Sequence, residues 1–305
     1  MSNDGTPGRA RVGAGSAGLR AVLRRLPAGG PEQQAVEAGE VDAVIDYGNA
    51  NVIMFPAARS ALRVAALRAS APSRKATPDA SAANAMLDAL PRAEYQRLLP
   101  DLEPVALKFG EVLHEPGAPI RHVYFPVDCV ICLLTRASGQ CFVETGLVGY
   151  EGAVGISLAF GVDASSVRAI VQTAGTALRI PAAPLNRALF GCLNLQRVLF
   201  RFAHAKLAQA RQTAACFASH LIEQRIACLF LMTSDRSRSR EFYLTQEYLA
   251  SILNVRRESV TASSASLRSR NLISYHRGRI EILDRKGLEA ASCSCYKAMS
   301  APYAA

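Results

Sequence analysis

The residues best suited to binding chemistry are the arginines of one C-terminal segment. Between Arg256 and Arg279 the sequence holds six arginines and one acidic residue, a local net charge of +5. Guanidinium groups at this density are typical of a surface that contacts nucleic-acid phosphates. Arg257 and Glu258 also suit base readout, because arginine can donate two hydrogen bonds to guanine and glutamate can accept one from cytosine. The chemistry that this segment indicates is DNA recognition.

The elements that must position these side chains begin with a short helix and a tight turn. Thr245 can cap a helix whose apolar residues Leu249, Ile252 and Leu253 recur at helical spacing. Asn254 follows, and asparagine tolerates the left-handed backbone of a turn. We therefore predict that the chain reverses direction at Asn254 and starts a second helix directly afterwards.

The second helix is predicted from about Arg256 to about Ser269. It should bury the apolar residues Val260 and Leu267. It should expose four polar residues, Arg257, Glu258, Thr261 and Ser264. Beyond it, alternating apolar residues flank the pair Arg277–Gly278, which predicts a β-hairpin. Helix, turn, basic helix and hairpin in this order predict a winged helix-turn-helix. The alternative is a small helical bundle with a solvated basic face.

Composition favours a folded protein of more than one domain. The 305 residues are 50% apolar and 20% charged, and the net charge is +10. The segment from residue 220 to the end carries +5 of that charge, from 13 basic and 8 acidic residues. No stretch approaches the roughly 18 apolar residues of a membrane span. Because arginines interrupt the apolar stretch near the N-terminus, we expect no signal peptide and a cytoplasmic location.

Eight cysteines are further candidates for site chemistry, but their spacing does not predict a metal site. Cys129 and Cys132 lie in an extended apolar run, where residues three apart point to opposite faces. Cys293 and Cys295 are too few for a site alone. We predict free, partly buried thiols and no metal, with a redox or metal sensor as the alternative.

The histidines argue against an enzyme of β-roll type, which needs a metal-binding histidine cluster. All five are isolated in the sequence, without paired spacing: His114, His122, His204, His220 and His276. We predict no catalytic residue and no enzymatic activity.

The central part of the chain predicts an antiparallel β-roll of jelly-roll type. A helix is expected over 87–99, followed by short strand-like runs separated by glycines. The runs are 104–109, 122–125, 129–135, 141–147 and 169–173. The fold class is therefore α+β, with a closed roll of cupin-like form.

A long helix is predicted from residue 185 to about residue 219. Its apolar stripe consists of Leu195, Val198, Leu199 and Phe202, at helical spacing. Packing against the roll explains one such stripe, but a helix of this length favours dimerisation through it. A further helix, 221–232, is expected to end at the charged turn 234–236.

Residues 1–84 are rich in Ala, Gly, Arg and Pro, and we expect them to be loosely ordered. Within them we predict a short basic helix over 18–26, a hairpin over 40–56 and a helix over 57–70. Residues 71–81 have the composition of a linker. The expected domains are thus 1–84, the roll 85–184, the dimerisation helix 185–219 and the winged helix-turn-helix 220–305.

The order of roll, long helix and winged helix-turn-helix resembles the Crp/Fnr family of bacterial transcription regulators. The resemblance covers about residues 85–290. It rests on FGEVL at 109–113 with Gly117, YFP at 124–126, VGYEG at 148–152, and above all LTQEYLASILNVRRESVT and NLISYHRGRIEI. It implies a sensor domain of cyclic-nucleotide-binding type, a homodimer formed by the long helix, and a recognition helix in the major groove.

The resemblance and the residue types together assign the DNA contacts. The base-reading residues are expected to be Arg257, Glu258 and Thr261. The phosphate-contacting residues are expected to be Thr245, Arg256, Ser259, Arg268, Arg277 and Arg279. Ala262 stands where several relatives have a second base-reading arginine.

The segment that grips the cyclic phosphate in such sensors departs from the family pattern. Ala153 stands in place of the glutamate and Ser165 in place of the arginine, so the acceptor for a ribose hydroxyl and the cation for a phosphate are missing. Arg168 is close in sequence but falls on the opposite face of a strand. No cysteine precedes Cys129, so the N-terminal cluster of iron–sulfur members is also missing. We identify no cofactor, and an unknown effector or a purely structural roll both stay open.

These observations predict a homodimeric, sequence-specific regulator of transcription that binds a palindromic site and does not respond to cyclic AMP. Double-stranded DNA and a second copy of the chain are the expected partners, RNA polymerase is a further candidate, and no membrane is involved. The alternative is a β-roll sensor or scaffold that acts through protein–protein contact and carries a vestigial helix-turn-helix.

Overall fold

The computed structural model describes residues 43–46, 51–54, 84–138 and 141–300. The chain divides into two compact units, residues 1–77 and residues 78–305. In the first unit, β1 (Ala43–Asp46) pairs antiparallel with β2 (Asn51–Met54), which confirms the predicted hairpin. The predicted helices at 18–26 and 57–70 and the predicted linker at 71–81 lie outside the described residues.

The second unit begins with two short helices, α4 (Ala85–Asp88) and α5 (Arg92–Leu98), and a 3-10 turn, η2 (Leu99–Asp101). The single helix predicted over 87–99 is therefore divided. Pro91 precedes α5, and proline cannot supply the backbone N–H that a continuous helix needs there. The buried Asn84 caps α4 and donates to the carbonyl oxygens of Pro126 and Gly152 at 2.8 and 2.9 Å.

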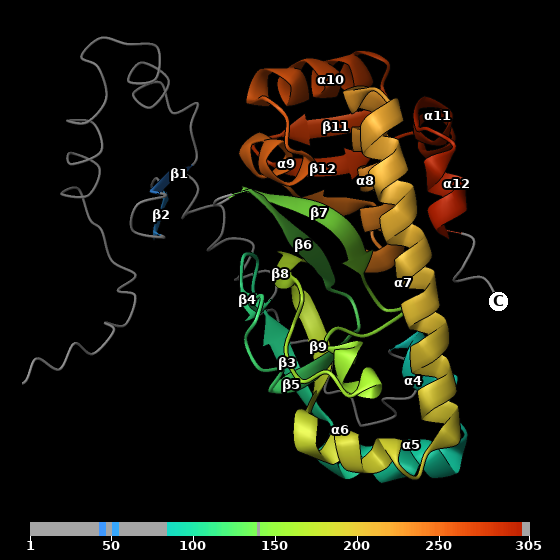
Figure 1. Cartoon of the computed structure of the whole chain (residues 1–305). Helices are drawn as coiled ribbons and strands as arrows, with labels where there is room; N and C mark the ends of the chain where they lie inside the picture. The colour runs from blue at the N-terminus through green and yellow to red at the C-terminus, as the bar shows by residue number, and fades with distance from the viewer. Residues whose placement is uncertain (1–42, 47–50, 55–83, 139–140, 301–305) are drawn as a thin grey trace, which may run out of the picture. The chain divides into compact units, whose positions relative to one another are not determined.

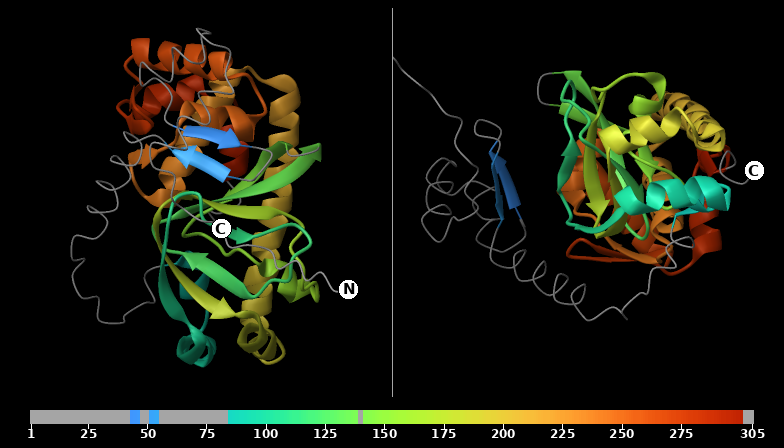
Figure 2. Two further views of the ribbon diagram at one scale, coloured as in Figure 1. Left: turned by 90° about the vertical axis from the view of Figure 1, so that its left-hand side faces the viewer. Right: turned by 90° about the horizontal axis from the view of Figure 1, so that it is seen from below.

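The roll consists of two antiparallel sheets (Figures 1 and 2). One sheet has the order β3-β9-β5 and the other the order β4-β8-β6-β7. The bounds are β3 (Glu103–Leu107), β4 (Val112–His114), β5 (His122–Pro126), β6 (Val130–Ser138), β7 (Cys141–Val148), β8 (Arg168–Thr173) and β9 (Gly175–Pro181). A 3-10 helix, η3 (Ile156–Phe160), lies between β7 and β8.

The predicted antiparallel roll is confirmed, but the expectation of a closed roll is wrong, because each sheet is open. The five predicted strand runs correspond to β3, β5, β6, β7 and β8. The pattern missed β4, which is only three residues long, and β9, in which Thr176 and Arg179 interrupt the apolar residues.

The long helix predicted from residue 185 is two helices, α6 (Ala182–Leu189) and α7 (Leu193–Ser219). The break includes Gly191, and glycine weakens a helix interior. α6 lies beside α5, while α7 runs along the roll toward the C-terminal part (Figures 1 and 2). With 27 residues, α7 spans about 40 Å.

The assignment of the α7 stripe to a dimer seam is corrected by the structure. Leu195 and Leu199 are fully buried and Phe202 is nearly so, all within the core that α7 forms with the roll. Val198 is half-buried and packs against the same core. Side chains already enclosed within one chain cannot form the contact surface for a second chain.

The C-terminal part is a winged helix-turn-helix. Its elements are α8 (Ile222–Ser237), β10 (Glu241–Tyr243), α9 (Gln246–Leu253), α10 (Arg257–Ser269), β11 (Ile273–His276), β12 (Arg279–Ile282), α11 (Arg285–Ala291) and α12 (Cys295–Ser300). The helix α8 continues through residues 234–236, where the sequence predicted a turn, because Arg236 is buried against the roll. β10 adds a third strand to the predicted hairpin, in the order β10-β12-β11.

One core joins the roll to the winged helix-turn-helix. Cys132, Leu134 and Phe142 of the roll share a buried cluster with apolar residues of α8 and α9, among them Phe230 and Leu249. Phe109, which follows β3, also packs edge-on against Tyr243 and Tyr248 with ring centroids 5.9 and 5.7 Å apart. Every helix in the described part of the chain is too short or too polar for a membrane span.

Candidate nucleic-acid interface

The turn between α9 and α10 has the geometry that the sequence predicts. Thr245 caps α9, its hydroxyl oxygen accepting from the N–H of Tyr248 at 3.1 Å. Asn254 has φ +51°, in the left-handed region. Directly after it, the N–H of Val255 donates to the carbonyl of Ala250 at 3.0 Å, which closes the helix end.

α10 is oriented by its buried face. Val260 and Leu267 are fully buried, as predicted. Ser264 is 1% exposed, so its predicted exposure is wrong. It lies four residues after Val260 and three before Leu267, which places it on the same face of the helix.

The candidate base-reading residues lie in the first turns of α10, outside its buried stripe. Glu258 and Thr261 are exposed and Arg257 is half-buried. The Thr261 hydroxyl donates to the side-chain oxygen of Gln246, at the first turn of α9, at 2.8 Å. Glu258 lies in the first turn of α10, where the helix dipole favours a carboxylate. Figure 1 shows α10 at the top of the winged helix-turn-helix, above β11.

The wing is a two-residue hairpin. Arg277 and Gly278 have φ +48° and +83°, the signs that a type I′ turn requires. A Cβ on Gly278 would lie 2.6 Å from the Tyr243 ring, so glycine is needed for space as well. Arg277 and Arg279 are both exposed, and Arg279 is paired with Glu241 of β10.

The other candidate phosphate contacts lie on the same winged helix-turn-helix. Arg256 precedes α10 and is exposed, and Arg268 is exposed in its last turn. Ser259 and Thr245 are half-buried near the N-termini of α10 and α9. Thr245 and Ser259 are thus placed where helix N–H groups can also bind a phosphate.

The motif at 148–152 holds the roll against α7 and α8. A Cβ on Gly149 would lie 2.4 Å from Cβ of Arg236, and one on Gly152 would lie 2.0 Å from the Phe202 ring. Glu151 forms ion pairs with Arg236 at 3.0 Å and with Lys206 at 3.5 Å. The two glycines thus permit close packing, and the glutamate ties both helices to the roll.

Two groups at this buried contact, Glu144 and Lys206, have shifted pKa values. Burial raises the pKa of Glu144 to about 7, although Arg236, Lys206 and Arg225 lower it. Burial likewise lowers the pKa of Lys206 to about 7, against the attraction of Glu151. The contact of the roll with α7 and α8 therefore contains a carboxyl and an amine whose pKa values are both near 7.

The roll segment that would grip a cyclic phosphate shows the departures seen in the sequence. Ala153 and Ser165 are buried, and the Ser165 hydroxyl donates to the carbonyl of Val167 at 2.7 Å. Arg168 pairs with Glu115 at 2.9 Å and lies 4.1 Å from the centre of the Phe142 ring. Arg168 is therefore engaged with neighbours in the roll.

The cysteines correct one expectation and confirm another. Cys129 and Cys132 are buried in two different cores, as opposite faces require. His220, expected to be isolated, lies 3.4 Å from Sγ of Cys295. Together with Cys216 and Cys293 they form a group of four potential metal ligands. The sequence had indicated only Cys293 and Cys295 as a pair. The spacing Cys216-x₃-His220 was the missed signal, since it places both side chains on one helical face.

Comparison with known proteins supports the assignment of the C-terminal part as a helix-turn-helix domain. Residues 224–291 match the family of Crp-like helix-turn-helix domains. FixK2 from Bradyrhizobium japonicum has a similar fold, with 13% identity, a TM-score of 0.54, and coverage of 63% of this chain and 98% of its own. A putative transcriptional regulator of the Crp/Fnr family from Eubacterium rectale aligns at 15% identity and a TM-score of 0.53, over 68% and 96% of the two chains.

A Crp/Fnr-family transcriptional regulator from Thermus thermophilus aligns at 23% identity and a TM-score of 0.50, over 62% of this chain and 98% of its own. At these identities the likeness establishes the fold. No curated protein sequence matches the chain.

Fold and site together define a winged helix-turn-helix protein with an attached cyclic-nucleotide-binding-like roll. The Crp-like domain on this fold confirms the resemblance to Crp/Fnr-type transcription regulators.

Proposed function

We propose that this protein is a homodimeric, sequence-specific DNA-binding regulator of transcription that recognises a palindromic site. The observation that supports this most is the start of α10 in a Crp-like helix-turn-helix domain, where Glu258 and Thr261 are exposed and Arg257 is half-buried. The first turn of a recognition helix is where side chains reach base edges in the major groove. The basic wing would contact the flanking phosphates without reading sequence.

The dimer would form through the face of α7 that the roll leaves uncovered. Phe200 and Leu207 are seven residues apart on that face and are 43% and 49% exposed. Phe160 of η3 is 54% exposed and packs on Phe200, with ring centroids 5.2 Å apart. Burying this apolar strip against a second copy would pair two α10 helices, as a palindromic site requires.

The protein would not respond to cyclic AMP. A cyclic phosphate needs a fixed cation, and Ser165 occupies that position while Arg168 is paired with Glu115. We expect calorimetry with cyclic AMP or cyclic GMP to show no binding at physiological concentrations. A micromolar Kd would contradict this proposal and leave the DNA-binding proposal intact.

A selection from random DNA with the full chain tests the main proposal. We expect enrichment of a sequence with two inverted half-sites, bound with a steep dependence on salt concentration. Failure to enrich any sequence would favour the alternative, a roll-based sensor or scaffold that acts through protein contacts with a vestigial helix-turn-helix. A cytoplasmic location and a contact with RNA polymerase remain part of the proposal.

A further inference from the structure

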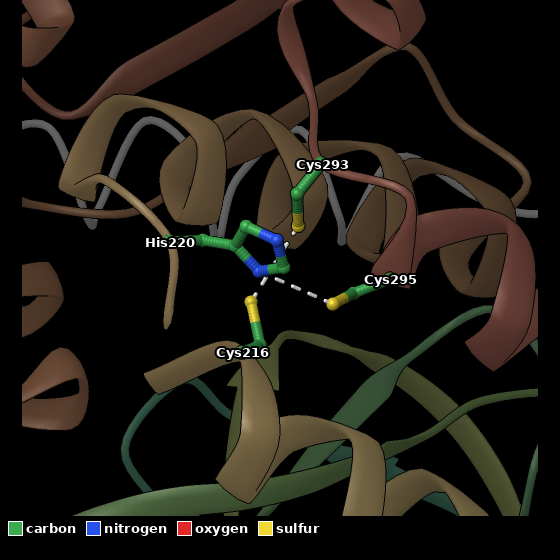
Figure 3. Close-up of side chains that lie close together, drawn as sticks. All are labelled: Cys216, His220, Cys293 and Cys295. Atoms are coloured by element: carbon green, nitrogen blue, oxygen red, sulfur yellow. Dashed lines mark hydrogen bonds between the residues drawn. The ribbon is translucent and has the colours of Figure 1, made fainter. Parts of the chain in front are cut away.

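Four side chains of metal-ligand type meet beside the junction of α7 and α8. Cys216 lies in the last turn of α7 and His220 directly follows it, while Cys293 lies between α11 and α12 and Cys295 is the first residue of α12 (Figure 3). The four potential ligand atoms all lie within 4.8 Å of one another. The three cysteines are buried and His220 is half-buried.

We propose that Cys216, His220, Cys293 and Cys295 bind one transition-metal ion of the zinc class. Three thiolates and one imidazole are a donor set of structural zinc sites, which are closed and four-coordinate. Sulfur ligands also exclude the hard cations, since calcium and magnesium take oxygen ligands. The proposal is independent of DNA binding, because no residue of the α10 face takes part.

The distances suit a tetrahedral ion after a small contraction. With Zn–S bonds of about 2.3 Å, the corners of such a site lie about 3.8 Å apart. Sγ of Cys216 lies 3.5 Å from Sγ of Cys293, and Sγ of Cys295 lies 3.4 Å from Nδ1 of His220. Two opposite edges of the tetrahedron are therefore already formed, and the longest separation of 4.8 Å needs to shorten by about 1 Å.

Polar neighbours support the ligands. The side-chain amide of Gln212, one turn before Cys216, donates to Sγ of Cys295 at 3.0 Å. Arg225 interacts electrostatically with Cys216 and Cys293. Because Zn²⁺ with three thiolates carries one net negative charge, Arg225 would balance it. Outer partners of this kind orient metal ligands.

The position of the site indicates a structural role for the ion. α12 packs on both α7 and α8, and the site would link the end of α7 to the N-terminus of α12. Arg225, beside the site, donates to the carbonyl of Leu253 at 2.7 Å, where α9 ends and the turn to α10 begins. A bound ion would therefore brace the junction between the roll's long helix and the helix-turn-helix.

The test uses the full chain, purified under reducing conditions without a metal-affinity step. We expect one zinc per chain by elemental analysis. After exchange with Co²⁺, we expect the visible absorption bands of tetrahedral cobalt together with thiolate-to-cobalt charge transfer. Cys293→Ser and Cys295→Ser should lose the stoichiometric ion, whereas Cys141→Ser, whose half-exposed thiol lies on β7 outside the cluster, should retain it.

Gln212→Ala keeps all four ligands and serves as a milder variant if the cysteine variants do not fold. Its zinc affinity should fall about 10-fold or more, measured by competition with a chromophoric chelator. The proposal is overturned by wild-type protein that binds no zinc or cobalt, or by cobalt spectra without thiolate bands. Iron with acid-labile sulfide, or a Cys216–Cys293 disulfide in freshly purified protein, would likewise overturn it.

Discussion

At the residue scale, the candidate interface separates two roles for arginine. Arg257 lies at the first turn of α10, next to Glu258, where side chains can reach base edges. Arg279 lies on the exposed wing, where a guanidinium is suited to contact the DNA backbone, and it also pairs with Glu241. The two side chains carry the same charge and differ in what their position lets them touch.

Arg257→Ala should therefore cost about 1–3 kcal/mol of binding free energy on the selected site and relax the preference at one guanine per half-site. Arg279→Ala is the matched control, since it should weaken all sequences alike and flatten the salt dependence by about one unit of slope. Repeating the DNA selection with both variants measures this. An unchanged consensus for Arg257→Ala would contradict the proposed role of α10.

The buried carboxyl of Glu144 gives a prediction for stability against pH. Its folded-state pKa of about 7 is above the ordinary value of 4.5, so the folded state binds more protons than the unfolded state between these values. The free energy of unfolding therefore falls as pH rises through this window, by up to about 3 kcal/mol. Glu144→Gln should remove that fall.

Urea unfolding of wild type and Glu144→Gln, at several pH values between about 5 and 8.5, measures the free energy of unfolding of both proteins. The difference between the two proteins should grow with pH and level off above about pH 7. A constant difference would mean that Glu144 is already ionised at low pH in the folded protein.

At the scale of elements, the position of α7 on the roll depends on a close contact between a glycine of the roll and a side chain of the helix. Gly152 faces Phe202 of α7 so closely that a Cβ would lie 2.0 Å from its ring. Phe202 is 6% exposed and belongs to the same core as Leu195 and Leu199. The helix is thus located by a glycine on the roll and a phenylalanine on its own inner face.

Gly152→Ala should lower the free energy of unfolding by about 1–3 kcal/mol, because the added methyl group forces the ring or the helix to shift. Thermal or urea unfolding measures the loss. The control is Gly191→Ala, where the nearest atom to the new Cβ is the Arg97 guanidinium at 3.7 Å, an ordinary contact. Equal stability of Gly152→Ala and wild type would show that this packing readily adjusts.

At the scale of the whole molecule, the assembly depends on which face of α7 is free. The inner face is enclosed by the roll, and the outer face carries Phe200 and Leu207. We expect Phe200→Glu to give a folded monomer, since two carboxylates would face each other across an apolar seam. Sedimentation velocity measures the mass, and DNA affinity should fall because the half-sites are no longer paired.

Phe202→Glu separates the two faces of the helix. It places a charge in the intrachain core, so it should reduce the free energy of unfolding strongly rather than simply dissociate a dimer. A stable monomer from Phe202→Glu, or a dimer that survives Phe200→Glu, would contradict a seam on the outer face of α7.

The sequence by itself determined the winged helix-turn-helix and most strands of the roll. These features are local: the cap at Thr245, the left-handed Asn254 and the turn at Arg277–Gly278 are properties of a few adjacent residues. Apolar spacing then marks which face of each element is buried. Composition and spacing also found the basic residues of α10 and the wing.

Only the tertiary structure decided which segments pack against each other. The stripe on α7 shows that one face is apolar, but only packing shows that the roll covers it instead of a second chain. Cys216 and Cys293 are 77 positions apart, and their sulfur atoms meet because α12 folds back onto α7. Glu144 and Lys206 acquire their altered pKa values in the same way, by burial between segments distant in sequence. The spacing of apolar residues in a sequence shows whether a segment is a helix or a strand and which face is buried. The segment that packs against that face depends on how the surfaces of distant segments fit together.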